Sequence, residues 1–276
     1  MTTFTLLVVL FAALLHAGWN ALVKAGPDKR LSATIVTVGA ALFALPLLPL
    51  VKPPAVDSWP WLGASACLQV TYYLLLAQAY KHGDISKTYP LMRGSAPLIV
   101  VLASSPVLGE TLSVGQYAAV ALIVVGILAM TVRDASSRTA TAFALSNAII
   151  IAAYTIVDGV GVRASGSAVA YTLWLFLLTA AGMLIYSIAR RHALLIYARQ
   201  HWKAGLAGGV GTMASYGLAL WAMTIVPVAV VAALRETSIV FAMLIASYLL
   251  HERVGRRRTM AAGLIVCGAA AMRLLR

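Results

Sequence analysis

The sequence consists of ten apolar runs of about twenty residues, separated by short connectors. A helix that crosses the hydrocarbon core of a bilayer needs about 20 mostly apolar residues. Only 11% of the 276 residues are charged, whereas a soluble protein has about 25%. The sequence therefore predicts an all-α integral membrane protein with ten transmembrane helices. These helices are expected near residues 4–23, 31–51, 59–80, 86–108, 113–132, 140–161, 168–189, 202–223, 226–250 and 257–275.

The formal net charge of +13 does not indicate a nucleic-acid partner, because Lys and Arg lie almost entirely in the connectors. Nucleic-acid-binding proteins gather basic residues on one face or along one helix. Cys67 and Cys267 each lie in an apolar run, with no second Cys or His at the spacing of metal ligands. The apolar runs also contain no HExxH or GxSxG motif. We expect no metal site, no cofactor and no catalytic residue.

The chain contains an internal repeat. A shift of 142 residues aligns the third to fifth runs with the eighth to tenth, and it places Arg93 on Arg235 and Glu110 on Glu252 without a gap. Apolar matches carry little weight in a composition this apolar, but matched charged residues do. The repeat predicts two homologous halves of five helices each.

An odd number of spans per repeat requires the second repeat, residues 138–276, to enter the membrane inverted relative to the first, residues 1–137. The connectors expected on one face carry fifteen Lys and Arg residues, those on the other face carry four, and two Arg lie within spans. Because cytoplasmic connectors are enriched in Lys and Arg, the face with fifteen is predicted to be cytoplasmic. Both termini are then expected outside.

Three charged residues lie deep within the predicted spans. Arg235 and Glu236 are near the middle of the ninth, and Arg93 is about a third of the way into the fourth. A charged side chain at a span centre costs about 2.5–3.5 kcal/mol on insertion scales, so it calls for a partner or a pathway. A guanidinium offers several donors suited to a carboxylate, phosphate or phosphonate. One interpretation is an anion-binding centre with Glu236 as counter-ion or proton carrier, and the alternative is a set of structural Arg–Glu pairs.

The first span has a polar face. His16, Asn20 and Lys24 are spaced by four residues, and Trp19 lies beside them. Polar side chains on an apolar helix are expected to face the interior of the bundle. Substrate contact is one explanation for His16, Trp19 and Asn20, and interhelical hydrogen bonding is the other.

Tyrosines and prolines mark the third and fourth spans, with Tyr73 in the third and Tyr89 beside Pro90 in the fourth. A proline inside a helix frees a backbone carbonyl, a device that transporters use where a helix lines a cavity. We include Tyr73 and Tyr89 in the candidate substrate-binding site. Kinked packing and interfacial anchoring are the alternatives.

Three carboxylates near helix ends are expected to have structural roles. Asp158 lies about one turn from the end of the sixth span, near Arg163, and is interpreted as a solvated or paired surface group. Glu110 and Glu252 fall at the entrance to the next helix, where a carboxylate complements the helix N-terminus.

The doubled pattern resembles the EamA-like branch of the drug/metabolite transporter superfamily. The resemblance rests on three stretches: Pro106-Val107-Leu108-Gly109-Glu110 with Gln116 and Gly126, Tyr248-Leu249-Leu250-His251-Glu252 with Gly263 and Gly268, and Leu15-His16-Ala17-Gly18-Trp19-Asn20-Ala21-Leu22-Val23-Lys24. It covers nearly the whole chain. The resemblance implies a ten-helix, two-repeat carrier that works by alternating access, in a superfamily that moves amino acids, nucleotide sugars, drugs and other metabolites.

Together these observations predict a secondary transporter in the cytoplasmic membrane for a small anionic or zwitterionic metabolite, such as an amino acid or an organophosphonate. Export is favoured by the resemblance, a proton is the candidate coupling ion, and the protein is expected to be a monomer or homodimer. A flippase for a lipid-linked head group and a non-transporting membrane scaffold are the alternative functions.

Overall fold

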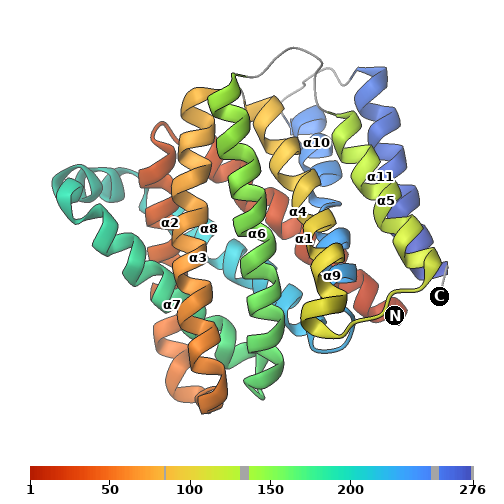
Figure 1. The fold of residues 1–276 in the computed structure, drawn as a ribbon. Coiled ribbons are helices and arrows are strands. Elements are labelled where there is room, and N and C mark those ends of the chain that lie inside the picture. The colour runs from red at the N-terminus through yellow and green to blue at the C-terminus, as the bar shows by residue number, and fades with distance from the viewer. Residues whose placement is uncertain (84, 131–136, 250–254, 275–276) are drawn as a thin grey trace.

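The computed structural model describes residues 1–83, 85–130, 137–249 and 255–274, and all regular secondary structure in these ranges is helical. Figure 1 shows the helices gathered into one bundle, with both termini at the same end. The elements are α1 (Thr3–Ala25), α2 (Lys29–Ala44), η1 (Leu45–Leu50), η2 (Val56–Ser58), α3 (Trp59–His82), α4 (Ile85–Leu108), α5 (Val114–Ala129), α6 (Arg138–Ala164), α7 (Ala168–Ser187), η3 (Ile188–Arg190), α8 (Arg191–Met223), α9 (Val228–Arg235), α10 (Ser238–Leu249) and α11 (Arg256–Leu274).

Several of these helices are suited to a membrane. Six segments of the described ranges are long and apolar enough to cross a bilayer, and α5 is a shorter apolar helix. The chain is therefore an all-helical, multi-pass membrane protein. The six segments are Thr3–Leu22, Lys29–Leu50, Thr88–Leu108, Arg138–Ala164, Ala168–Met223 and Val228–Ile245.

Short polar side chains begin several helices. The Asp28 carboxylate accepts hydrogen bonds from two backbone N–H groups at the start of α2. Ser113 forms a capping box with Gln116 at the start of α5, and Ser137 and Ser167 cap α6 and α7. Each cap satisfies backbone donors that have no partner within the helix. These residues explain why the helices begin where they do.

The ninth apolar run, expected as one helix over 226–250, is two helices. Helix α9 begins after Pro227 and ends at Arg235, and α10 begins at Ser238. Between them the backbone N–H of Glu236 and that of Thr237 bond to carbonyls three residues earlier, and the Thr237 hydroxyl donates to the Leu234 carbonyl at 2.7 Å. This tighter turn interrupts the α-helical ladder. The break places Glu236 at a discontinuity inside the bundle.

The eighth run also differs from the prediction, because α8 begins at Arg191 and not near residue 202. His201 has non-helical dihedral angles (φ −123°, ψ 19°), so a kink separates the first turns from the apolar part. The connector expected over residues 190–201 is therefore mostly helical. Its side chains are largely exposed. An exposed helix has a charged composition like that of a loop, so composition alone does not distinguish the two.

The packing of the helices follows the sequence repeat. In the repeat, α1, α2 and α3 correspond to α6, α7 and α8. The contact between α3 and α6 has its counterpart in the contact between α8 and α1, and the contact between α2 and α8 has its counterpart in the contact between α7 and α3. Helices α5 and α11 lie side by side (Figure 1). A Cβ at Gly126 would lie 2.8 Å from the Ala261 carbonyl oxygen, and one at Gly268 would lie 2.9 Å from that of Ala119. The two glycines, 142 residues apart, thus make reciprocal close contacts between these helices.

Candidate functional site

A buried ion pair joins α4 to the break between α9 and α10. The Nε of Arg93 donates to Oε2 of Glu236 at 2.9 Å, and the two side chains are 4% and 5% exposed. The Arg93 side chain sits one turn before Pro97, which cannot donate to the Arg93 carbonyl and so leaves it out of the helical ladder. The sequence therefore brings a charged side chain and a freed backbone acceptor to the same turn of α4.

The neighbouring Arg235 has no carboxylate within ion-pair distance among the described residues. Its guanidinium lies over the ring of Tyr216, 4.7 Å from the centroid, in a cation–π contact. Within the described part of the chain, neither Arg235 Nε nor Arg93 Nη2 has a hydrogen-bond partner, although both are buried. Buried donors normally have acceptors, so these two unpartnered atoms are the unusual feature of this group of charges.

A small cavity lies between these charges. The volume of this cavity is about 10 Å³, which is near the minimum that holds a single water molecule. A metabolite does not fit in this conformation, in which the centre is closed. The cavity is lined by Arg93, Ala96, Pro97, Val100, Ile151, Thr155, Ala232, Arg235 and Glu236.

The predicted residues of α1 lie next to α9 and α10, which pack against this helix. His16 and Trp19 are buried, with an edge-to-face contact of 5.1 Å between ring centroids. The Trp19 Nε1 donor lacks an acceptor among the described residues, whereas the Asn20 amide donates to the carbonyl of His16 in its own helix. Trp19 thus has an unused donor, and the Asn20 donor is already engaged. The side chain of Lys24 lies outside the described residues.

The two predicted tyrosines are placed differently. Tyr89 is one turn before Arg93 on α4 and is partly buried. Tyr73 is buried among Ala33 and Met183, away from the residues that line the cavity. Edge contacts connect Tyr73 to Tyr72, Tyr72 to Tyr154 and Tyr154 to Tyr216, so a row of aromatic rings runs from Tyr73 to the face that holds Arg235.

The interpretation of Asp158 as a surface carboxylate is wrong. Asp158 is fully buried because α6 continues beyond it to Ala164 and packs there against α3, α7 and α8. Its carboxylate accepts hydrogen bonds from Tyr171, Tyr216 and Gln69. The signal that could have identified this site is the polar face formed by Asn147, Tyr154 and Asp158 in the sixth run, all three of which are buried.

Glu110 complements the N-terminus of a helix, as predicted, but this helix is α9 and not α5, the helix that follows Glu110 in the chain. Both of its carboxylate oxygens lie 2.9 Å from the backbone N of Val228. Arg163 holds the same carboxylate at 2.6 Å and donates to the Met223 carbonyl at 2.8 Å. The link after α4 is thereby tied to the ends of α6 and α8 and the start of α9. Glu252 lies outside the described residues.

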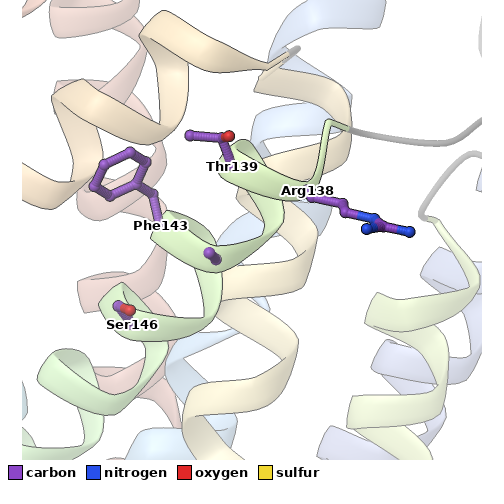
Figure 2. Close-up of a pocket in the computed structure, with 5 residues that line it drawn as sticks. Arg138, Thr139, Phe143 and Ser146 are labelled. Atoms are coloured by element: carbon purple, nitrogen blue, oxygen red, sulfur yellow. The ribbon is translucent and has the colours of Figure 1, made fainter.

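A larger hollow of about 430 Å³ opens at the N-terminal end of α6. Figure 2 shows its lining, Arg138, Thr139, Phe143 and Ser146, on a single helix. His82 stacks on Phe143 beside it. None of Arg93, Arg235 and Glu236 lines this hollow. Within the described ranges, no cluster of His, Cys, Asp and Glu is arranged to hold a metal.

A multi-pass helical bundle that gathers charged side chains at a helix break in its interior has the architecture of a membrane transporter. The model of the EamA-like transporter family matches residues 3–132 and again residues 138–274, so the chain belongs to this family. A crystal structure of a protein 21% identical to this chain shares its fold, with a TM-score of 0.77 over 100% of both chains. No curated protein matches the sequence.

Proposed function

We propose that this protein is a secondary transporter for a small anionic or zwitterionic metabolite, amino-acid-like or organophosphonate-like. The observation that carries the proposal is the pair of buried guanidiniums, Arg93 and Arg235, which have unpartnered N–H donors beside the single carboxylate of Glu236. A carboxylate or phosphonate supplies the acceptors that these donors lack. Because Glu236 bonds only Nε of Arg93, an incoming acid competes with Glu236 for Arg93 and engages Arg235.

The break between α9 and α10 supports a moving part at this centre. Discontinuous helices at the interface of two repeats are where transporters bind substrates and change conformation. Replacement of Glu236 by the substrate at Arg93 loosens α9 and α10 from α4 and opens the closed cavity. His16, Trp19 and Asn20 on α1 and Tyr89 on α4 line the path to the centre, and Tyr73 lies further along the row of aromatic rings.

We further propose that the chain crosses the membrane ten times, as two inverted repeats divided near residue 137. The reciprocal contacts of Gly126 and Gly268, the equivalent helix pairings and the position of both termini at one end support this arrangement. The fifteen basic residues of the connectors on one face support a cytoplasmic location for that face, with the termini outside.

In this proposal the transporter works by alternating access in the cytoplasmic membrane, as a monomer or homodimer. It leaves its substrate chemically unchanged and needs no cofactor. Export is the favoured direction, and a proton is the candidate coupling ion.

A thermal-shift screen of the purified protein against amino acids and alkylphosphonates tests the proposal. A ligand at a hundredfold excess over its Kd raises the free energy of unfolding by about 2.7 kcal/mol. We expect an acidic compound to stabilise the wild type and not Arg235→Gln. Arg273→Gln, which removes an exposed cation from α11, is the matched control and keeps the full shift. A ligand that stabilises Arg235→Gln as much as the wild type would contradict the assignment, and a response to lipid-linked head groups alone would favour a flippase.

A further inference from the structure

Asp158 is a buried carboxylate held only by neutral groups. The hydroxyl of Tyr171 donates to its Oδ1 at 2.9 Å, the hydroxyl of Tyr216 donates to its Oδ2, and the Gln69 amide nitrogen lies 3.5 Å from Oδ2. No Lys, Arg or His of the described chain lies within ion-pair distance of it. An ionised carboxylate in such a place needs a compensating charge nearby, because isolated buried charges are costly.

One side chain, Tyr216, lies between Asp158 and the guanidinium of Arg235. The hydroxyl of Tyr216 bonds to Asp158, and the ring of the same tyrosine carries the guanidinium of Arg235 on its face. Among the described residues, the Asp, Glu, Lys and Arg residues that are at most 5% exposed are Arg93, Arg235, Glu236 and Asp158. The two guanidiniums together balance the two carboxylates: Arg93 bonds Glu236 directly, and Arg235, next to Glu236 in the chain, is separated from Asp158 by Tyr216.

We propose that Asp158 is the proton-binding site of this transporter, and that it takes up one proton when an anion engages Arg235. This inference rests on the proposed function. An anion at Arg235 neutralises the cation that balances Asp158 and leaves one unbalanced negative charge in the bundle. A proton from the aqueous side that is open then binds the Asp158 carboxylate and restores the balance, and it leaves when the anion leaves.

The surroundings of Asp158 suit both of its protonation states. Ser65 lies one turn before Gln69 on α3, and its buried hydroxyl has no hydrogen-bond partner within the described residues. The long contact to Gln69 allows that amide to reverse and present its oxygen, which accepts a hydrogen bond from the protonated acid. Glu236 is the competing candidate, because a substrate that replaces it at Arg93 leaves this carboxylate without its partner, so the experiment below has to separate the two acids.

The titratable and charged groups that face this site come from every helix around it. Tyr171 is on α7, Tyr216 on α8 and Tyr154 one turn earlier on α6 itself. Helix α9 presents Arg235 beyond Tyr216, α4 presents the paired Arg93, α3 presents Tyr72 against Tyr154, and the nearby η2 carries the exposed Asp57.

Infrared difference spectroscopy of the full-length protein in lipid vesicles tests this assignment without a substrate. Arg235→Gln removes the cation in the same way that a bound anion neutralises it. We expect the carbonyl band of a protonated carboxylic acid to be absent from the wild type at neutral pH, present in Arg235→Gln, and lost again in Arg235→Gln/Asp158→Asn. The band persists in Arg93→Gln/Arg235→Gln/Glu236→Gln, which removes the Arg93–Glu236 pair whole and so separates Asp158 from Glu236 without changing the charge balance.

The proposal is overturned if the wild type already shows an Asp158 band at neutral pH, if Arg235→Gln gains none, or if the band is absent from the triple variant that also lacks the Arg93–Glu236 pair. Arg235→Lys keeps the charge and is expected to show no band, and helical circular dichroism confirms that each variant is folded. Because no ligand is added, this result is independent of the ligand screen. A band that behaves as expected in a protein that binds no acidic metabolite would refute the transport proposal while leaving the proton site in place.

Discussion

At the scale of residues, Arg93 and Glu236 hold α4 to the helix break, and each charge depends on the other. Removing one partner of a buried pair costs about 3–5 kcal/mol, because the remaining charge is left uncompensated. Glu236→Gln is therefore expected to lower the free energy of unfolding by about this amount. Arg93→Gln/Glu236→Gln, which removes both charges, should recover most of the loss. Thermal unfolding in detergent measures both variants, and a double variant no more stable than Glu236→Gln would argue against a pair.

Gly161 determines where the tyrosine beside Asp158 can lie. A Cβ at this position would lie 2.7 Å from Cε2 of Tyr171 and 2.7 Å from Cβ of Trp61. Gly161→Ala is expected to destabilise the protein by about 1–3 kcal/mol, the usual cost of overpacking. Gly63→Ala on α3 is the control, because nothing lies within 4 Å of its added Cβ. Equal unfolding temperatures for the two variants would show that Tyr171 is not seated on Gly161.

At the scale of elements, the N-terminus of α9 depends on a carboxylate from the other half of the chain. Glu110→Ala removes the acceptor of the Val228 N–H and the partner of Arg163. Loss of a cap costs about 0.5–2 kcal/mol, so hydrogen exchange of the α9 amides should accelerate roughly tenfold.

Ser113→Ala is the matched control for this exchange experiment, because Ser113 caps α5. It should accelerate exchange at the start of α5 and leave α9 protected. Exchange in α9 that is unchanged in Glu110→Ala would mean that the cap contributes nothing to its stability.

Apolar run length and repeat spacing predict a helix in each of the ten regions. They also identify Arg93, Arg235 and Glu236 as candidate substrate-binding residues. The break after Arg235 is not visible in that pattern, because the apolar run continues through it and the interruption is a local turn with a Thr237 side-chain bond. The burial of Asp158 is not visible in the sequence for a related reason. Its proximity in sequence to Arg163 suggested a pair, but Arg163 points to Glu110 and the carboxylate faces Tyr216. Such choices between partners depend on tertiary packing.

At the scale of the whole molecule, the inverted arrangement predicts that equivalent links lie on opposite faces of the membrane. Lys81, in the last turn of α3, and Thr224, directly after α8, are both exposed and lie at the ends of repeat-equivalent helices. In a background without Cys67 and Cys267, a membrane-impermeant thiol reagent should label Thr224→Cys on intact cells. It should label Lys81→Cys only after permeabilisation. Labelling of both positions from the same side would rule out the inversion.

Arg93 and Arg235 are proposed to bind the acidic substrate that this protein carries across the membrane. Counterflow in proteoliposomes tests this proposal most directly: vesicles loaded with an acidic compound selected by the thermal screen are diluted into the same compound carrying a radiolabel. We expect wild-type vesicles to accumulate the label transiently, Arg273→Gln vesicles to do the same, and Arg93→Gln and Arg235→Gln vesicles to fail. Accumulation by the arginine variants at the wild-type rate, or none by the wild type, would contradict this account.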